Sequence, residues 1–400
     1  MSEMETLTLV DAFQGELDRI LAYWSTYAPD AEHGGFHGKI DNDNHVTPHA
    51  PKGAVLHGRI LWAFSAAYNH EPRPEYLAQA TAAFQFLSRY FIDPTHGGVY
   101  WSVDYQGQPL DTKKQIYALA FAIYGLAEFY RASGRESTLT MARELYSTIE
   151  QHSHDATYGG YLEALARDWS PLADLRLSAK DANEKKSMNT HLHVLEAYAN
   201  LYRVWPDAGL RQRIGQLLDV FFDHIIDSQT QHLILFSDED WTPKSTTVSY
   251  GHDIEAAWLL LEAAEVLGDD VRINRFQEVA VRMAQAAFEG LNLSGGLNYE
   301  YEPDTNHLVA ERHSWVQAEA MVGFLNAYEL SGETRFYDAF QSVWDFTQRH
   351  ILDQARGEWY WGVQADQAVM TGQDKAGFWK CPYHNSRACL EIMRRLRHVA

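Results

Sequence analysis

A glycine-aromatic segment recurs about every sixty residues along this chain. Each copy begins with one or two glycines and continues into a short run of alternating side chains, which is typical of a turn that leads into a β-strand. Five copies begin at Gly34, Gly97, Gly159, Gly295 and Gly357. The gap after Gly159 is twice the usual length, and residues 233–236 supply a sixth copy there without the glycines. The chain is therefore built from six similar units, none of which can bury its apolar face alone.

A second signal divides each unit into two helices. Glycine-containing turns at 133–135, 268–270 and 331–333, and prolines in the other units, end one apolar-periodic helix and open the next. We therefore expect twelve helices, over residues 7–28, 53–69, 74–91, 113–132, 137–152, 184–203, 210–226, 248–267, 271–289, 314–330, 334–351 and 385–398.

Six helical hairpins predict an all-α fold, an (α/α)6 barrel with short β-hairpins at one end. An open solenoid is the alternative architecture. Closure is favoured because every second helix is rich in small and apolar residues and begins with polar ones, as an inner ring would require. The alternate helices, such as residues 210–226, have a more charged face and are expected to form an outer ring. We expect residues 1–400 to form a single domain.

Composition limits the partners of the chain. A net charge of -21 argues against nucleic acid or an anionic membrane surface as a partner, and a neutral ligand fits best. No apolar run is long enough to span a bilayer, and no secretory signal opens the sequence. Cys381 and Cys389 lie too far apart along a helix to form a disulfide. These features predict a reduced, cytoplasmic protein. The sequence does not decide the oligomeric state, and a monomer or a homodimer is expected.

Histidines at the beginnings of the inner helices indicate one shared pocket. They lie in three segments, residues 187–198, 249–258 and 379–388. A single histidine is more often a hydrogen-bonded structural residue than a catalytic one. Here the imidazoles recur at equivalent places in different units, which favours a functional role. The histidines expected to converge are His193, His252 and His384.

Imidazole can act as an acid or a base near neutral pH. Two such groups on opposite sides of a bound sugar could remove a proton from one face of a carbon and return it to the other, as epimerisation requires. The enediolate formed in between needs stabilisation, and the Arg59 guanidinium could supply that positive charge. Glu255, three residues after His252, could orient its partner imidazole. The alternative for Glu255 is a structural ion pair.

Metal and phosphate chemistry are disfavoured. His191 and His193 point to different faces of a helix, and the chain has neither an HExxH motif nor paired CxxC motifs. No Walker or dinucleotide-binding fingerprint is present. Aromatic residues are expected to line the pocket, with Trp315 and Trp379 stacking on a sugar, while Trp24 and Trp344 are expected in the core. The full set of expected wall residues is Trp62, Trp258, Trp315, Trp361, Phe378 and Trp379.

Four segments together resemble the N-acylglucosamine 2-epimerase superfamily, and most closely its cellobiose 2-epimerase and mannose 2-epimerase branch. They are residues 189–198, 249–255, 317–319 and 379–385. The resemblance covers nearly the whole chain. It implies a six-hairpin α/α barrel that acts on a neutral mono- or disaccharide and requires no cofactor or metal.

The resemblance also implies residue roles. His252 and His384 would be the two acid/base groups, His193 would assist ring opening, and Arg59 would hold the enediolate. The implied reaction is ring opening, proton removal at C2, rotation about the C2–C3 bond and reprotonation on the other face. Other pocket positions are matched by Tyr117, Asn189, Glu255 and Glu319.

One departure from the branch leaves the substrate open. Relatives that use disaccharides usually carry two adjacent tryptophans where this chain has Ser314 and Trp315. The substrate could thus be a free monosaccharide or the reducing end of a disaccharide such as cellobiose. The long charged loop over residues 162–186 is a candidate lid.

Three other functions stay open at this point. An aldose–ketose isomerase that makes fructose from mannose needs the same enediolate. A glycoside hydrolase would instead depend on paired carboxylates, such as Asp181 with Glu255 or Glu319. A non-catalytic sugar-binding protein is the third alternative.

Overall fold

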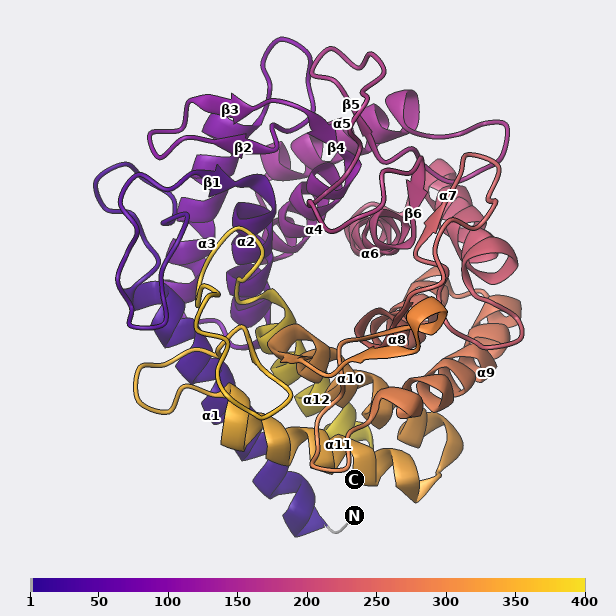
Figure 1. Cartoon of the computed structure of the whole chain (residues 1–400). Coiled ribbons are helices and arrows are strands. Elements are labelled where there is room, and N and C mark those ends of the chain that lie inside the picture. Colours follow the sequence, from indigo (N-terminus) through magenta and orange to yellow (C-terminus); the bar gives the residue numbers. More distant parts are fainter. Residues whose placement is uncertain (1–2, 400) are drawn as a thin grey trace.

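Residues 3–399, the part of the chain that this computed structural model describes, form twelve α-helices in two concentric rings (Figure 1). The inner ring consists of α2 (Ala54–His70), α4 (Ile116–Ser133), α6 (Met188–Val204), α8 (Tyr250–Leu267), α10 (Ser314–Ser331) and α12 (Tyr383–Val399). The outer ring consists of α1 (Glu3–Thr26), α3 (Pro74–Phe86), α5 (Glu136–His152), α7 (Ala208–Val220), α9 (Asp270–Ala287) and α11 (Thr334–Phe346). Each predicted helix is present, with its ends shifted by a few residues.

Four outer helices continue into a turn of another helical type, a π-helix or a 3-10 helix. The helices predicted from sequence are longer because they include these turns. A π-helical turn follows α3, α7 and α11, at Leu87–Phe91, Phe221–Ile225 and Thr347–Ile351, and a 3-10 turn, Phe288–Gly290, follows α9. These turns continue the apolar periodicity of the helix and direct the chain back toward the inner ring.

The inner ring is closed. Its last helix, α12, packs against both α10 and the first inner helix, α2. The backbone also joins the two ends of the chain, because the Ile40 amide donates to the Ala376 carbonyl at 2.8 Å and the Ala376 amide donates back at 3.2 Å. The predicted (α/α)6 barrel is confirmed, and the open solenoid is wrong.

Short antiparallel ladders hold the inner helices at one end of the barrel. A two-residue strand leads directly into each of five inner helices and pairs with a strand of the following unit. The beginnings of the inner helices, where the candidate site residues lie, are therefore fixed side by side. The ladders are β1 (Lys52–Gly53) with β2 (Ser102–Val103) and β3 (Pro109–Asp111), β4 (Lys114–Gln115) with β5 (Ala164–Leu165), β6 (Lys186–Ser187) with β7 (Phe236–Ser237), β8 (Val248–Ser249) with β9 (Glu300–Glu302) and β10 (His307–Val309), and β11 (Arg312–His313) with β12 (Gly362–Val363).

The six glycine-aromatic segments form the same structure in every unit. Each makes one β-bridge back to the end of the preceding outer helix, as Phe36 does with Pro29. The glycine-free copy is confirmed, since Leu233 bridges to Ile226. There Gln231 takes the left-handed backbone conformation (φ 65°) that a glycine takes in most other units.

Buried Lys–Asp ion pairs clamp four of these turns, three of them to strands that lead into inner helices and one to the loop before α12. In the first unit, Lys52 Nζ lies 2.8 Å from Asp30 Oδ2 and donates to the Gly34 carbonyl at 2.7 Å. Asp30 in turn accepts the backbone amides of Glu32 and His33. The same pair, which no sequence pattern predicted, recurs as Lys114–Asp93, Lys186–Asp155 and Lys375–Asp353.

Close backbone contact between inner helices sets the geometry near Arg59. A Cβ on Gly58 would lie 2.9 Å from the Phe121 carbonyl, and one on Gly125 would lie 2.5 Å from the Gly58 carbonyl. Only glycine permits α2 and α4 to approach this closely, which brings Arg59 next to Tyr117.

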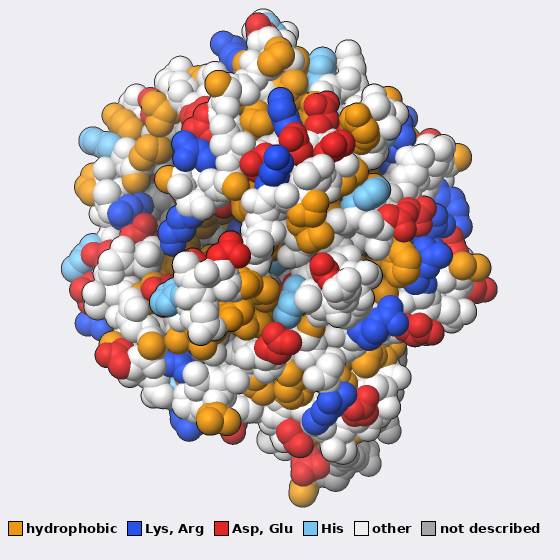
Figure 2. Space-filling model, turned by 45° about the vertical axis from the view of Figure 1, so that its right-hand side comes forward, with side chains coloured by type: hydrophobic (Ala, Val, Ile, Leu, Met, Phe, Trp, Pro, Cys, Tyr) orange, Lys and Arg blue, Asp and Glu red, His pale blue; other side chains and the backbone are white. Residues whose placement is uncertain are grey.

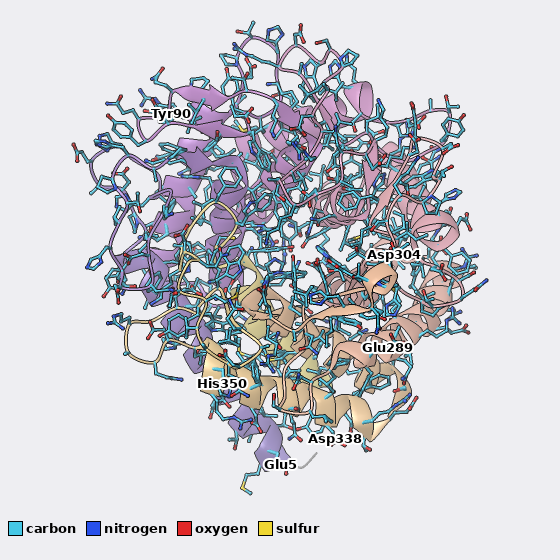
Figure 3. The ribbon with its side chains drawn as sticks, viewed as in Figure 1. Glu5, Tyr90, Glu289, Asp304, Asp338 and His350 are labelled. Carbon is cyan, nitrogen blue, oxygen red and sulfur yellow. The ribbon has the colours of Figure 1, made fainter. Side chains whose placement is uncertain are left out.

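Charged side chains lie mainly on the outer surface. In Figure 3 the labelled Glu5, Glu289 and Asp338 lie on the outer part of the molecule, away from the barrel axis. Among the described residues, no helix is both long and apolar enough to cross a membrane. Cys381 and Cys389 are buried free thiols, as predicted, although Cys381 precedes α12 instead of lying on it.

We predict that Lys52→Met destabilises the barrel by about 3–5 kcal/mol, because it leaves the Asp30 carboxylate buried without its partner. The urea dependence of unfolding would measure this loss. Arg176→Met is the control, since Arg176 and Asp174 form an ion pair with 39% and 58% of their side chains exposed. That change should cost less than about 1 kcal/mol. Equal unfolding midpoints for the two variants would contradict the clamp.

Candidate active site

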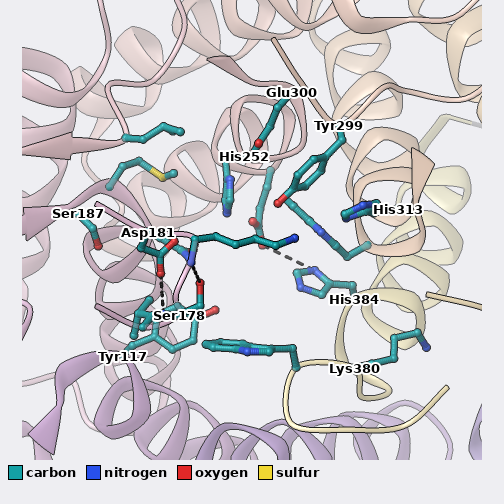
Figure 4. A pocket seen from close by; sticks show the side chains of 18 of the residues that line it. Tyr117, Ser178, Asp181, Ser187, His252, Tyr299, Glu300, His313, Lys380 and His384 are labelled. Carbon is teal, nitrogen blue, oxygen red and sulfur yellow. Dashed lines mark hydrogen bonds and ion pairs between the residues drawn. The ribbon is translucent and has the colours of Figure 1, made fainter. Parts of the chain in front are cut away.

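One cavity of about 630 Å³ opens where the inner helices begin (Figure 4). The surface is hollowed there, and hydrophobic, acidic and histidine side chains gather around the hollow (Figure 2). The structure thus brings together nearly all of the residues predicted from sequence. Those that line the cavity are Arg59, Tyr117, Asn189, His193, His252, Glu255, Trp315, Trp379 and His384. Glu319 lies behind His384.

His252 lies in the first turn of α8 and is held by a hydroxyl group. Its Nδ1 lies 2.8 Å from Ser249 Oγ, which leaves Nε2 as the ring nitrogen available to a ligand. Burial lowers the pKa of His252 to about 3, and the neighbouring His193 and His384 add to the shift. The imidazole is therefore neutral near pH 7, which is the form that can accept a proton.

His384 lies in the first turn of α12 and is held by a carboxylate. Its Nδ1 donates to Glu319 Oε1 at 2.6 Å, so Nε2 is again the nitrogen left for a ligand. Burial lowers the pKa of His384 to about 3, while the Glu319 charge opposes that shift. The rings of His252 and His384 pack against the same indole, that of Trp315, with centroid distances of 4.8 and 5.5 Å. The two bases therefore face one region of the cavity.

His193 forms a further carboxylate-held imidazole on α6. Its Nδ1 bonds to Glu196 Oε2 at 2.7 Å, and its ring packs against Tyr117 and Phe121. Burial lowers the pKa of His193 despite the Glu196 charge. This imidazole lies beside Tyr117, the residue that also contacts Arg59.

Arg59 presents a fixed positive charge to the same space. Nη2 donates to Tyr117 Oη at 2.8 Å, and Nη1 donates to the Trp379 carbonyl at 3.2 Å. The guanidinium also lies over the rings of Phe121 and Tyr383, at 4.2 and 4.7 Å from their centroids. These contacts hold Arg59 in one position, and none of the described residues is an ionic partner for it, which leaves its charge available to an anionic oxygen.

Arg387 is the main functional residue that the sequence analysis missed. Its Nη2 donates to Glu255 Oε1 at 2.8 Å and to Glu319 Oε1 at 2.6 Å, and its Nη1 bonds to Glu196 and Tyr383. One guanidinium on α12 thus joins carboxylates from α6, α8 and α10. Helical spacing could have indicated this network, because Arg387 lies three residues after His384 and Glu196 three after His193.

The predicted role of Glu255 in orienting an imidazole is wrong. Its Oε1 lies 3.9 Å from His384 Nδ1, whereas Glu319 accepts the hydrogen bond from that nitrogen. Glu255 is bound to Arg387 instead, since its side chain points toward the guanidinium beneath the cavity.

Among the described residues, the carboxylates of Glu255 and Glu319 and the His384 imidazole form the one group with ligand atoms close enough for a metal, within 4.8 Å. Arg387 already donates hydrogen bonds to both carboxyl groups.

His191 has a structural role and points away from the cavity that His193 lines. Its Nδ1 donates to the Ser187 carbonyl at 2.7 Å, and its Nε2 accepts the Tyr161 amide at 2.9 Å. It therefore closes the glycine-aromatic turn of its unit. His57, Asp253 and Gln317 close the corresponding turns in three other units.

The aromatic lining agrees only in part with the prediction. Trp315, Trp361 and Trp379 line the cavity, together with Trp359. Trp62 instead stacks on Tyr124 in the core, and Trp258 is buried and donates its indole N–H to Glu319. Each lies three residues, about one helical turn, beyond a pocket residue and hence deeper in the barrel. Phe378 packs against Trp101, and Trp24 and Trp344 are buried as predicted.

Part of the predicted lid covers the cavity. Residues 177–181 line it, and Ser178 and Asp181 lie opposite His313 and His384 (Figure 4). Gln115 anchors this loop, because its Nε2 donates to the carbonyls of residues 175 and 176 at 3.1 and 2.9 Å. Closure of the loop over a ligand stays a prediction.

Comparison with known proteins is consistent across sequence and structure. The family model described as N-acylglucosamine 2-epimerase (GlcNAc 2-epimerase) matches residues 34–388. The chain is 50% identical to the cellobiose 2-epimerase of Bacteroides fragilis, over 94% of this chain and 96% of that protein. The solved cellobiose 2-epimerase from Bacillus thermoamylovorans is 41% identical with a TM-score of 0.93, over 97% of this chain and 99% of that one. A solved D-mannose isomerase, 22% identical with a TM-score of 0.85 over 96% and 97% of the chains, shares the fold.

We predict that His191→Gln folds normally and weakens the pH dependence of stability. Gln317 already closes another turn by accepting the Leu297 amide and donating to the His313 carbonyl, so glutamine can replace both bonds of His191. Burial lowers the pKa of His191 to about 4, below its ordinary value of 6.5. The stabilisation from its neutral form is thus present above about pH 6.5 and is lost as the pH falls toward 4.

The measurement is the free energy of urea unfolding at pH 7, 6 and 5. The wild-type protein should lose about 1 kcal/mol more per pH unit than His191→Gln over this range. The control is His45→Gln, because 79% of the His45 side chain is exposed and it closes no turn. This control should keep the wild-type slope, and a His191→Gln slope equal to it would contradict the assignment.

Proposed function

This chain belongs to the N-acylglucosamine 2-epimerase family and is a carbohydrate epimerase, and we propose that it inverts C2 of the reducing-end sugar of cellobiose. The observation that carries the proposal is the pair of imidazoles, His252 and His384, packed on the Trp315 indole and facing one cavity. Each has Nδ1 engaged by the protein and Nε2 left for the sugar. Two opposed bases are what a proton transfer between the two faces of one carbon requires.

In the proposed reaction, His193 assists opening of the sugar ring to the free aldehyde. One of the two opposed imidazoles then removes the C2 proton, and the electrons of the C–H bond move toward the C1 oxygen. Arg59 stabilises the resulting enediolate through its buried positive charge. After rotation about the C2–C3 bond, the other imidazole returns a proton to the opposite face of C2.

A disaccharide suits the dimensions and the lining of the cavity. Its volume of about 630 Å³ is in the range of pockets that enclose ligands larger than one sugar ring. Trp361 takes the place of the tryptophan that is missing beside Trp315. The Ser314 amide bonds to the Trp361 carbonyl, and the Trp361 side chain also lines the cavity. The 50% identical relative is named for cellobiose. We therefore favour cellobiose over free mannose or glucose.

The geometry opposes a glycoside hydrolase. A hydrolase needs two carboxylates on either side of the scissile bond. Of the two possible partners of Asp181, Glu319 lies behind His384, and Glu255 is bound to Arg387. An aldose–ketose isomerase would use the same enediolate and return the proton to C1, so product analysis must separate it from the epimerase.

We also propose roles for the other residues of the site. Tyr117, Asn189, Trp315 and Trp379 line the cavity and would bind the sugar, while Glu319 would act through His384. We also propose that the chain works as one catalytic domain, in the cytoplasm, as a monomer or homodimer, without a cofactor or metal.

We predict that incubation with cellobiose in deuterated water, with a chelator present, yields glucosylmannose that carries deuterium at C2. The deuterium enters because the imidazoles exchange protons with solvent between turnovers. Product separation and NMR at C2 measure this, and a parallel incubation with mannose compares the two substrates. Fructose from mannose would replace the proposal by an isomerase, and glucose released from cellobiose would replace it by a hydrolase.

We predict that His252→Ala and His384→Ala each lower kcat by about 10²–10⁴, the usual contribution of a general acid or base. Calorimetric binding of cellobiose should change much less, because neither change removes the aromatic walls. His191→Gln is the matched control, as His191 lies on the same ring but closes a structural turn. Turnover retained by either alanine variant would remove that histidine from its role.

A further inference from the structure

We infer that Glu255 is a protonated carboxylic acid that donates to an oxygen of the bound sugar, as a second donor beside Arg59. The inference rests on the proposed function for its reaction step. The protonation state of Glu255 follows from contacts within the protein and does not depend on the proposed reaction.

Glu255 and Glu319 share one hydrogen-bond donor. Nη2 of Arg387 lies 2.8 Å from Glu255 Oε1 and 2.6 Å from Glu319 Oε1. Both carboxyl groups are buried, with about 1% of each side chain exposed. Two carboxylates held this close in a region of low dielectric repel strongly, so one of them retains its proton.

The contacts of the two groups decide which one is protonated. Glu319 accepts hydrogen bonds from His384 Nδ1, from the Trp258 indole N–H and from Arg387, so three donors stabilise its charge. Among the residues that the structure describes, Glu255 has one such donor, Arg387. The proton therefore resides on Glu255.

The charge balance of the buried cluster leads to the same assignment. The guanidinium groups of Arg59 and Arg387 carry two positive charges, and ionised Glu196 and Glu319 carry two negative ones, all in buried side chains. An ionised Glu255 would leave one uncompensated buried negative charge, which is strongly unfavourable.

The pKa shifts agree with this distribution. Burial and the neighbouring Glu319 charge raise the pKa of Glu255 well above its usual range. For Glu319, burial is outweighed by the Arg387 charge and the His384 hydrogen bond, which hold its pKa below its usual range. The titratable and charged groups around Glu255 are His252 on α8, Tyr117 on α4, His193 and Glu196 on α6, Glu319 on α10, Tyr383, His384 and Arg387 on α12, and Arg59 of α2 at the same cavity.

Glu255 can reach a substrate, because it lines the same cavity as His252 and His384, whereas Glu319 lies behind His384. When an imidazole removes the C2 proton, negative charge develops on the C1 oxygen. The Glu255 O–H bond then donates its proton toward that oxygen, and Arg387 stabilises the carboxylate left behind. When C2 is reprotonated on the other face, the C1 carbonyl reforms and the proton returns to Glu255, so no proton is gained or lost.

The protonation state is tested by infrared difference spectroscopy on the ligand-free protein at pH 8. We expect wild-type protein to show the carbonyl-stretch band of a protonated carboxylic acid, and Glu255→Gln to lose it. Glu300→Gln is the matched control, because the Glu300 carboxyl lines the same cavity, and burial raises its pKa only to about 7. This control should keep the band at pH 8. Identical wild-type and Glu255→Gln spectra would overturn the inference, whether or not the protein proves to be an epimerase.

Kinetics test the donor role separately. Glutamine preserves a hydrogen-bond donor but cannot transfer a proton, so Glu255→Gln should lower kcat about tenfold and change KM little. Glu255→Leu should lower kcat by about 10²–10³, as loss of an oxyanion donor does. Because the wild-type group works in its protonated form, kcat should fall as the pH rises through the pKa of Glu255, and Glu255→Gln should lack this alkaline limb. An unchanged kcat and an unchanged alkaline limb in Glu255→Gln would exclude the role.

Discussion

The site depends on one buried positive charge, the guanidinium of Arg387. It bonds to carboxylates of three different helices, Glu196 on α6, Glu255 on α8 and Glu319 on α10. Two of these carboxylates hold the imidazoles of His193 and His384. Without the guanidinium, the charges beneath the cavity would repel and could not stay buried. Arg387 therefore fixes both the spacing of four inner helices and the orientation of two catalytic candidates.

On an inner helix, the distance of a residue from the strand that leads into the helix decides whether its role is structural or functional. The residue four places after the lead-in strand closes the glycine-aromatic turn, as His57, His191, Asp253 and Gln317 do. The residue six places after the strand belongs to the site. These residues are Arg59, Phe121, His193, Glu255 and Glu319. Two places correspond to about 200° of helix rotation, so the two positions face opposite sides of the same helix. The barrel can thus change its chemistry at one position without disturbing the turns that hold the ring together.

This periodicity explains how much the sequence could predict. The six-unit repeat defined the barrel and its twelve helices, because glycine turns and apolar periodicity are local signals. His193, His252 and His384 do converge as predicted, but their places in the repeat are not equivalent, because His193 lies six residues after its lead-in strand and His252 only three. The Arg387 network did not follow, because which buried charges meet depends on how α12 closes the ring against α2 and α10. The sequence also does not indicate how deep in the barrel a side chain lies. Trp62 and Trp258 are therefore expected in the cavity wall from sequence, although they lie one turn below it.

The unequal partners of the two opposed imidazoles fit a reversible proton transfer. A carboxylate only accepts, so Glu319 fixes the Nδ1 proton of His384 and leaves Nε2 as a base in the neutral ring. The Ser249 hydroxyl can donate or accept, so His252 can present Nε2 in either form. The Glu319 charge also favours the imidazolium of His384 relative to that of His252.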